Sequence, residues 1–414
     1  MSGQSALRIW TWIFCLVSAV GAKQNKIFVQ MPNVQPKVHD TYMCTAMKMN
    51  STEYVVSFTP KQSKPHTAHH MLLYGCESPG FKDSSWDCGE MHSGDGKTMR
   101  QGPTCASGAK IIYAWAMEAP NLQLPKDVGF KIGGDSKINW LVLQIHYKDV
   151  DRFVKGDTDN SGLELQLSPQ PTPNGAGVIA MGTSGAISAT SIVYMETACK
   201  YKDKIDIYPF AYRTHAHSHG VVNSGYRIRD GKWTEIGRKS PQQPQMFYKV
   251  TNPGMDVKKG DILAARCTMV NKDNEVVQIG STAKDEMCNF YIMYWTHGDH
   301  LPSVTNCWTF GPPQWNWGNF EDQRAINLKA EPKTASTDPN SHQSYKQTSL
   351  LKQIIKTAGA QQTTGDNSAY EYYNEVRPED EQEMRDRILA EQYDQRFEPD
   401  DEYSFLGQSD AWNY

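Results

Sequence analysis

The 414-residue sequence has no marked excess of either charge, since 42 basic residues stand against 46 acidic ones. A net charge of −4 gives none of the overall basic character that is typical of nucleic-acid binding. Also absent is an uncharged apolar run of about 18 residues, the length that a helix needs to span a bilayer, and the mean hydropathy is −0.61. We therefore expect a soluble product with no nucleic-acid partner and no membrane span.

Long amphipathic helices are missing from residues 27–310. This part instead carries short runs of β-branched and aromatic residues bounded by turn residues, for example at 53–58, 137–146 and 286–294. Such runs are typical of an all-β sandwich or barrel, and 11 Trp, 20 Tyr and 13 Phe are enough for a large core. A natural boundary lies at residues 168–177, where three prolines cannot donate to a strand ladder.

The N-terminus has the pattern of a secretory signal peptide. Arg8 precedes an apolar stretch over residues 9–20, and the small residues Gly21 and Ala22 follow it. The alternative is a buried helix or a membrane anchor, but the stretch is too short to span a bilayer comfortably. Removal of residues 1–22 would leave eight cysteines, an even number that predicts four disulfides without selecting among the 105 possible pairings.

Two further features indicate how the chain is organised. The sequon at Asn50 fits a secreted glycoprotein. Beyond about residue 315 the sequence turns polar, and residues 371–402 hold 13 acidic and four basic side chains, so we expect a solvated tail that is disordered or loosely docked. The predicted segments are a signal peptide (1–22), an N-terminal domain (27–168), a C-terminal domain (177–315) and a polar, acidic tail (316–414).

The histidines are unevenly placed and suggest metal ligands. His215 and His217 are two apart, so in a strand both imidazoles would lie on one face and could bind one ion. The neighbours His69 and His70 would point to opposite faces of a regular strand and could share a metal only across a bulge or an irregular turn. His146 ends an apolar run, where a core histidine is the commoner case. Solvent exposure or core packing is the alternative at each position.

The histidines alone leave the kind of metal open, because imidazole suits zinc, copper, iron and nickel. The sequence has no His-Glu-x-x-His motif, and no carboxylate stands at ligand spacing beside either cluster. A thioether ligand would favour Cu(I), but spacing cannot select one of 17 methionines.

Four motifs occur together in a fixed order. They are His-His-Met-Leu-Leu-Tyr-Gly-Cys (69–76), Leu-Gln-Ile-His-Tyr (143–147), Tyr-Arg-Thr-His-Ala-His (212–217) and Met-Cys-Asn-Phe-Tyr-Ile-Met-Tyr (287–294). With them the chain resembles the copper type II, ascorbate-dependent peptidylglycine alpha-hydroxylating monooxygenases over about residues 38–310. The resemblance implies two antiparallel, jelly-roll-like β-sandwich domains, each with one copper, that face each other across a solvent-filled cleft.

The resemblance also implies the metal ligands. The first copper would be held by His69, His70 and His146, and the second by His215, His217 and Met287. Three imidazoles suit a copper that stores an electron, whereas the soft thioether favours Cu(I) and leaves room for dioxygen. O2 would bind, and hydrogen would be taken from the substrate, at the second copper, and ascorbate would reduce both coppers again. The implied catalytic residues are Met287, His215, His217 and Tyr291.

The implied substrate is a peptide that ends in glycine, whose free carboxylate needs a cation. Arg213 matches the family's carboxylate-binding arginine, and its bidentate fork suits a carboxylate better than a point charge does. Without the resemblance, a surface arginine would be the commoner case. The other residues implied at the site are Asn289 and Tyr291 as hydrogen-bond partners of the carboxylate, Met293 in the pocket wall, and Tyr42 and Gln144 in supporting roles between the coppers.

The family pattern pairs all eight cysteines that follow the signal peptide. The implied disulfides are Cys44–Cys88, Cys76–Cys105, Cys199–Cys307 and Cys267–Cys288. Two features depart from the family. Asn160 stands about where vertebrate relatives have a cysteine of a fifth bridge, and Ser218 replaces a histidine that often follows the second ligand, with His219 one place later.

We expect the chain to hydroxylate the α-carbon of the terminal glycine, the first step of C-terminal peptide amidation, in the secretory granule lumen or after secretion. The roughly 100 polar residues after residue 315 do not provide a lyase domain, so we expect a monofunctional enzyme whose product passes to a separate peptidylglycolate lyase. The alternatives are a related catecholamine β-hydroxylase, whose amine substrate has no carboxylate for Arg213, and a non-catalytic secreted protein that binds copper or peptide.

Overall fold

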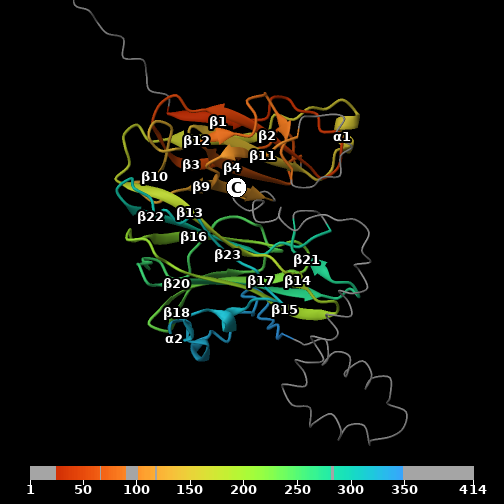
Figure 1. Ribbon diagram of the computed structural model, residues 1–414. Coiled ribbons are helices and arrows are strands. Elements are labelled where there is room, and N and C mark those ends of the chain that lie inside the picture. The colour runs from red at the N-terminus through yellow and green to blue at the C-terminus, as the bar shows by residue number, and fades with distance from the viewer. Residues whose placement is uncertain (1–24, 66, 90–100, 117–118, 281–283, 348–414) are drawn as a thin grey trace, which may run out of the picture.

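The computed structural model describes residues 25–65, 67–89, 101–116, 119–280 and 284–347, and it consists almost entirely of strands (Figure 1). The all-β prediction is therefore confirmed. The helical segments of the described residues are one turn long: α1 (Asp151–Val154), η1 (Trp317–Asn319), α2 (Gln323–Ile326) and η2 (Leu328–Ala330). None of the described helices is long and apolar enough to cross a membrane. The predicted signal peptide and the acidic stretch at 371–402 lie outside the described residues.

The first sandwich packs two sheets around a core of aliphatic and aromatic side chains. One sheet has the order β6 (Trp86–Asp87), β2 (Thr41–Lys48), β11 (Trp140–Tyr147), β4 (His70–Cys76) and β8 (Lys110–Ala116). The other contains β1 (Lys26–Gln30), β12 (Gly162–Leu167), β3 (Glu53–Lys61) and β10 (Val128–Ile132), with β9 (Leu122–Gln123) on β3 and the small pair β5 (Ser78–Pro79) and β7 (Cys105–Ser107) nearby. In β1 exposed and buried side chains alternate, as expected of a strand with one face on the core.

The second sandwich is built in the same way. One sheet contains β13 (Asn174–Thr183), β22 (Asn289–His297), β16 (Tyr208–His215) and β19 (Tyr248–Lys249), with β23 (Asn306–Thr309) also on β13. The other has the order β15 (Ser191–Lys200), β20 (Ile262–Asn271), β17 (Gly220–Arg229) and β18 (Lys232–Lys239), and β14 (Ala186–Ile187) pairs with β21 (Val277–Gln278). All strand pairs within these two sheets are antiparallel except β13 with β23.

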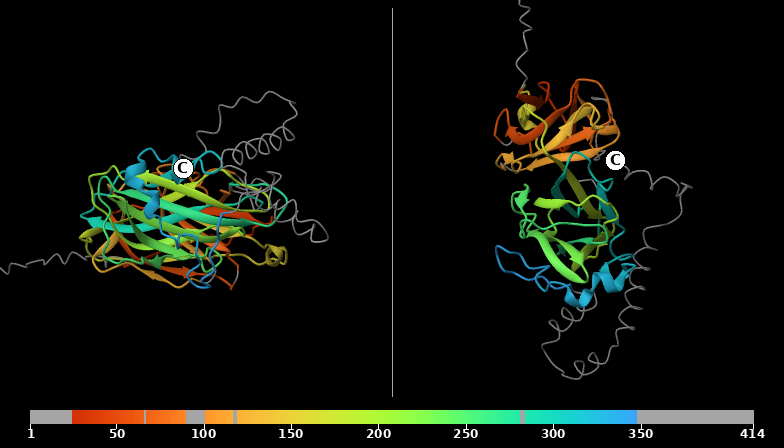
Figure 2. Two further views of the ribbon diagram at one scale, coloured as in Figure 1. Left: turned by 90° about the horizontal axis from the view of Figure 1, so that it is seen from below. Right: turned by 90° about the vertical axis from the view of Figure 1, so that its left-hand side faces the viewer.

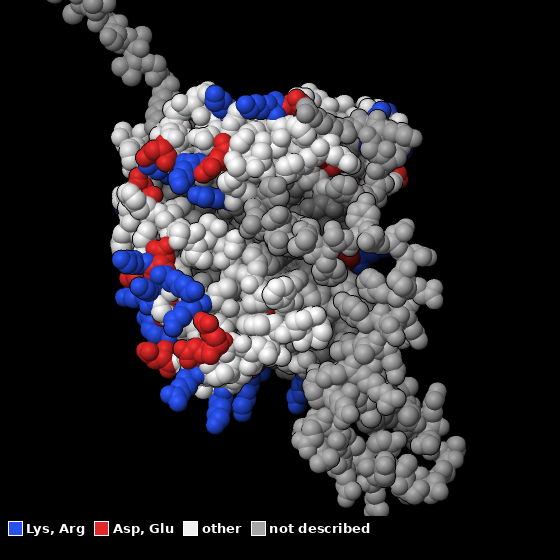
Figure 3. Space-filling view, viewed as in Figure 1, with Lys and Arg blue, Asp and Glu red and all other residues white. Residues whose placement is uncertain are grey.

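One sheet continues from the first sandwich into the second, and the two sandwiches are stacked (Figure 2). The join is a short parallel pairing of β10 with β13, in which Val128 is opposite Asn174 and Gly129 is opposite Gly175. An ion pair between Lys131 and Asp299, at 2.7 Å, adds a side-chain link across the same join. In the space-filling view, basic and acidic side chains lie intermixed on one side of both domains, consistent with the small net charge (Figure 3).

Residues 316–347 differ from the prediction of a loosely attached tail, because they pack on the second sandwich. Trp317 and Ile326 are fully buried, Phe320 is buried beside them, and the Trp317 indole donates a hydrogen bond to the Thr197 carbonyl oxygen at 3.0 Å. Although this segment is polar on average, it carries a few large apolar side chains that contact the second sandwich. Burial of these side chains stabilises the docking of the segment.

A buried arginine fixes the same segment electrostatically. Arg266 pairs with Glu196 inside the second domain and with Glu331 of the docked segment, at 2.7 Å. Its guanidinium also lies 4.0 Å from the ring centroid of Tyr194 and 4.3 Å from that of Trp317. The charge is thus enclosed by two carboxylates and two aromatic rings. One carboxylate and one ring belong to residues 316–347, the docked segment.

The described residues contain four disulfides, and they are the pairs that the resemblance implies: Cys44–Cys88, Cys76–Cys105, Cys199–Cys307 and Cys267–Cys288. Each bridge contributes roughly 2 to 4 kcal/mol by constraining the unfolded chain. Cys288 adjoins Met287 and Cys76 ends the strand that begins at His70, so two of the bridges lie on segments that carry predicted ligands.

Candidate metal centres and substrate site

The first predicted ligand set meets at one end of the five-stranded sheet of the first domain. His70 begins β4 and is directly opposite His146 of β11. His69 precedes the strand, and its backbone N–H donates to the His146 carbonyl oxygen at 2.9 Å. In a regular strand, neighbouring side chains point to opposite faces. His69 lies outside the strand, so its ring can point to the same side as that of His70. The Nδ1 atom of His69 lies 3.3 Å from the Nδ1 atoms of both His70 and His146.

This geometry fits a metal ion. Two nitrogens that each lie about 2.0 Å from one ion at a tetrahedral angle are about 3.3 Å apart. Burial lowers the pKa of His69 and His70 below the ordinary value, and it lowers the pKa of His146 to about 4. The three rings are therefore neutral near neutral pH and can each present a lone pair to the ion.

Two further side chains orient His146. Its Nε2 atom lies 3.1 Å from Oδ1 of Asp40, so the proton is held on Nε2 and Nδ1 is left for the metal. The Tyr42 ring stacks on the imidazole, with centroids 4.3 Å apart. Tyr42 was predicted as a supporting residue, whereas Asp40 was missed, because it is 106 positions away in the sequence and belongs to no motif.

Gln144 was predicted to lie between the two coppers. The structure buries it in the first domain, where its amide nitrogen donates to the Thr104 hydroxyl at 3.2 Å and lies 3.6 Å from Sγ of Cys88. The side chain therefore packs beside the Cys44–Cys88 disulfide. Its role between the metals stays a prediction.

The second ligand set lies where β16 ends and β22 begins. His215 is the last residue of β16 and is opposite Asn289, the first residue of β22. Its Nε2 atom lies 3.3 Å from Sδ of Met287, which immediately precedes the disulfide-bonded Cys288. His217 was expected on the same strand face as His215, but it lies beyond the strand end, and a turn brings its ring to a centroid distance of 5.6 Å from that of His215.

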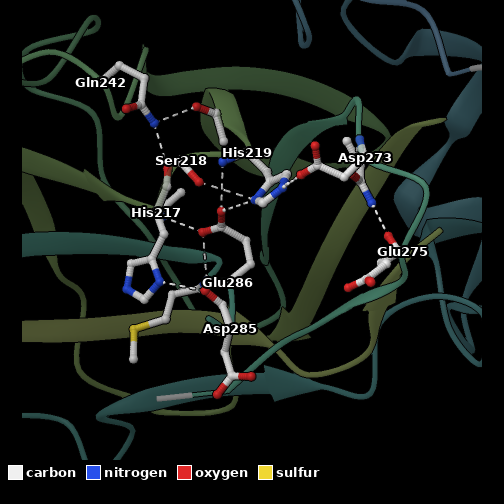
Figure 4. A network of polar contacts seen from close by, with 12 residues as sticks. His217, Ser218, His219, Gln242, Asp273, Glu275, Asp285 and Glu286 are labelled. Carbon is white, nitrogen blue, oxygen red and sulfur yellow. Dashed lines mark hydrogen bonds and ion pairs between the residues drawn. The ribbon is translucent and has the colours of Figure 1, made fainter. Parts of the chain in front are cut away.

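Hydrogen bonds fix the tautomers of both histidines. His217 Nδ1 donates to the Asp285 carbonyl oxygen at 2.8 Å (Figure 4), and His215 Nδ1 donates to Oε1 of Gln245 at 2.5 Å. Each ring therefore keeps its Nε2 lone pair for a metal. Burial and the charge of Arg213 hold the pKa of His215 well below its usual value. Two imidazoles with a thioether form a donor set that fits copper and favours Cu(I).

The predicted substrate residues lie on the same pair of strands. Arg213 of β16 is opposite Tyr291 of β22, and its guanidinium lies 5.2 Å from the centroid of that ring. Met293 is opposite Ala211 in the same register. Antiparallel pairing therefore brings together the residues that the sequence motifs placed in two distant segments.

Arg213 is buried, with 2% of its surface exposed. Its Nε atom donates to the Gln245 backbone oxygen at 2.8 Å, and one terminal nitrogen lies 3.3 Å from Oε1 of the same residue. Arg213 forms no ion pair with any carboxylate of the described residues. Gln245, which belongs to none of the sequence motifs, thus contacts both the predicted carboxylate-binding arginine and His215.

The two ligand sets face each other across the domain interface. Besides burial and the neighbouring His146, electrostatic interactions with His215 and Arg213 lower the pKa of His70, and an interaction with His217 contributes to the lowered pKa of His69. Across the same interface the rings of Tyr113 and Phe247 stack with centroids 6.4 Å apart. Each centre therefore lies within electrostatic range of the other.

Comparison with known proteins identifies the family. Residues 27–154 match the model of the copper type II ascorbate-dependent monooxygenase N-terminal domain, and residues 174–320 match that of the C-terminal domain. The chain therefore belongs to the copper type II ascorbate-dependent monooxygenases. Copper and ascorbate, the cofactors expected from the motifs, are those of this family.

Individual relatives agree with this assignment. The chain is 41% identical over 299 residues to mouse peptidyl-glycine alpha-amidating monooxygenase, covering 70% of this chain and 29% of the mouse protein. It is 40% identical over 303 residues to peptidyl-glycine alpha-amidating monooxygenase B of Xenopus laevis, covering 72% and 33%. Human dopamine beta-hydroxylase is 26% identical over 293 residues, covering 64% and 45%. The chain thus spans about a third of the length of the amidating monooxygenases that it matches.

Proposed function

We propose that the chain hydroxylates the α-carbon of the C-terminal glycine of peptides, with O2 as co-substrate and ascorbate as reductant. The proposal assigns one copper to His69, His70 and His146 and the other to His215, His217 and Met287. It is supported by the similarity to amidating monooxygenases, which is greater than the similarity to dopamine beta-hydroxylase.

The buried guanidinium of Arg213 is the observation that carries this proposal. A buried charge is costly unless it is paired, and the described residues offer it amide and phenol oxygens but no carboxylate. A peptide's terminal carboxylate would supply the missing partner in a bidentate, charge-assisted contact. The amine substrate of a catecholamine hydroxylase would not.

The position of Arg213 also explains which atom reacts. It lies two residues before His215 on β16, and a strand advances by about 3.3 Å per residue, so the guanidinium and the imidazole are about 7 Å apart along the strand. A carboxylate held at Arg213 keeps the adjacent glycine α-carbon beside the second centre. Asn289 and Tyr291 lie on the neighbouring strand, opposite His215 and Arg213, and this register supports their assignment as further hydrogen-bond partners of the carboxylate.

The two centres are suited to different tasks. The bound coppers would supply the one-electron and O2 chemistry. The set with Met287 favours the reduced ion that dioxygen requires, whereas the all-histidine set fits the storage of the second electron. Arg213 and its neighbours bind and orient the peptide only at the second set.

The proposal includes the cell compartment and a partner. We place the protein in the secretory granule lumen or outside the cell, supported by four disulfides and by an exposed sequon at Asn50. Glycosylation at Asn50 stays a prediction. The product would be a peptide ending in α-hydroxyglycine, and its conversion to the amide and glyoxylate by a separate lyase is part of the same proposal.

The direct test supplies a short glycine-extended peptide with copper, ascorbate and O2 and measures the mass of the product. A gain of one oxygen on the terminal glycine is expected. A protein that binds two coppers but oxidises only an amine such as dopamine would be a catecholamine hydroxylase. Two bound coppers without turnover of either substrate would instead indicate a copper- or peptide-binding protein.

A further inference from the structure

Glu286 lies between the end of β16 and the start of β22, and none of its side-chain surface is exposed. One carboxylate oxygen accepts the backbone N–H groups of His217 and Met287, the latter at 2.7 Å. The other oxygen accepts the backbone N–H of His219 at 2.8 Å and lies 3.2 Å from Nδ1 of that ring (Figure 4). A single carboxylate thus joins the two segments that carry the second ligand set.

The strand ladders do not hold these segments. His217 belongs to the turn between β16 and β17, and Met287 precedes β22, so neither backbone N–H has a ladder partner at that point. Hydrogen bonds to a carboxylate are charge-assisted and are roughly twice as strong as those between neutral groups. We propose that Glu286 is a positioning residue of the second metal centre, which fixes the backbones of His217 and Met287 relative to each other. This inference rests on the proposed role of both residues as copper ligands.

The carboxylate can act as a fixed point because its own backbone is anchored. The N–H of Glu286 donates to the Gln278 oxygen at 2.9 Å, and its carbonyl oxygen accepts from Gly280 at 3.0 Å. Cys288, two residues on, is bonded to Cys267 of β20. The Glu286 backbone is therefore tied to the body of the domain, and through its side chain the turn that contains His217 is tied there too.

The turn is held from its other side as well. Gln242 donates to the His217 carbonyl oxygen at 2.6 Å, and Nε2 of His219 lies 3.5 Å from a carboxylate oxygen of Asp273. The His219 ring therefore lies between the carboxylates of Glu286 and Asp273. His219 directly follows Ser218, the position at which the sequence departs from the family pattern.

The test compares Glu286→Gln with the wild type by copper binding and by X-ray absorption. The amide of the variant presents N–H donors to backbone N–H donors, so at least one hydrogen bond is lost. We expect the affinity of the second centre, measured by competition with a chelator, to fall about 10- to 100-fold. In the reduced protein the sulfur scattering that Met287 contributes should weaken, while the first copper is retained.

A matched control is Asp159→Asn in the first domain. Asp159 is also fully buried, but its carboxylate accepts hydroxyl groups of Tyr147 and Ser161 rather than the backbone of any ligand. We expect this variant to lower the melting temperature while leaving the copper affinity and the sulfur signal of the second centre unchanged.

Two results would overturn the inference. One is a folded Glu286→Gln protein with wild-type affinity and sulfur scattering. The other needs no variant: in the copper-free wild type, the amide hydrogens of His217 and Met287 should exchange slowly, and exchange as fast as in an exposed loop would show that the carboxylate does not hold them. A wild-type protein that binds only one copper would contradict the proposed function instead.

Discussion

In the first domain, His70 and His146 are directly opposite each other on paired strands, whereas in the second domain only His215 of the three predicted ligands lies in a strand. The first set is therefore fixed by a sheet ladder and by ring contacts from Asp40 and Tyr42. The second depends on side chains that hydrogen-bond to the backbone. The two centres thus differ in how they are held as well as in which atoms they present.

The largest difference between the centres should appear on removal of the thioether. We expect Met287→Ile to abolish hydroxylation, because an alkyl side chain cannot act as a ligand for Cu(I), while the three-histidine centre keeps its copper. Product mass and copper content measured on the same preparation check this. Turnover close to that of the wild type would show that Met287 has no part in the chemistry and that the proposed difference between the two centres does not depend on a thioether ligand.

Removal of the docked segment, residues 316–347, tests whether the stability of the second domain depends on residues outside its sandwich. A chain ending at residue 315 would expose the surface under Trp317 and would remove Glu331 from the buried Arg266, which keeps Glu196 as its partner. The lost burial alone costs about 1.5 to 3 kcal/mol for a large apolar side chain such as Ile326. A chain ending at residue 347 retains every described contact and is expected to keep its activity.

Denaturant unfolding of both chains measures this effect. The sequence predicted a solvated tail beyond about residue 315 that is disordered or loosely docked. The buried side chain of Ile326 and the ion pair of Glu331 with Arg266 contradict that prediction for residues 316–347. Equal stability of the two truncated chains would show that the segment is not part of the second domain.

The substrate contact is expected at the second centre only. Arg213→Ala should raise KM for a glycine-extended peptide about 10- to 100-fold, since a charge-assisted hydrogen bond contributes about 1.5 to 3 kcal/mol. Arg213→Lys restores the charge without the bidentate fork, so its KM should lie between the two. A loss of copper with an unchanged KM would assign Arg213 to the structure of the centre.

The first centre can be weakened through its supporting carboxylate. Asp40→Asn should lower the copper affinity of the first centre about tenfold, because the hydrogen bond that holds the His146 tautomer is weakened. Chelator competition at the second centre is the internal control and should not change. An equal loss at both centres would mean that Asp40 acts on the interface between the domains.

Acid should lower the free energy of unfolding of the copper-free protein, because His146 of the first centre takes up a proton on unfolding. Burial lowers the folded pKa of His146 to about 4, below its unfolded value of about 6.5. Its contribution to stability is complete above pH 6.5 and is lost as the pH falls from 6.5 toward 4, with a slope of up to about 1.4 kcal/mol per pH unit. Urea titrations at several pH values measure the slope, and His146→Gln should reduce it.

The predicted ligands lie in short sequence motifs, whereas the side chains that hold them lie outside those motifs. Runs of β-branched and aromatic residues predicted the strands, and the motifs named the histidines and Met287 because those residues lie inside short, recognisable segments. The supporting contacts join distant positions: 106 residues separate His146 from Asp40, 69 separate His217 from Glu286 and 30 separate His215 from Gln245. A local sequence pattern cannot predict such contacts, because they depend on the register of the strands and on the path of the turns.

The pairing of β1 with β12 has a consequence for the order of events during synthesis. Lys26 lies opposite Gln166, so the strand that follows the predicted signal peptide finds its partner only after nearly the whole first domain has been made. Pairings so distant in sequence form slowly. Until then β1 is an unpaired edge, which can associate with other chains. Chaperones that hold nascent chains would therefore matter most before residue 167 emerges, and the second domain can start to fold on a finished first one.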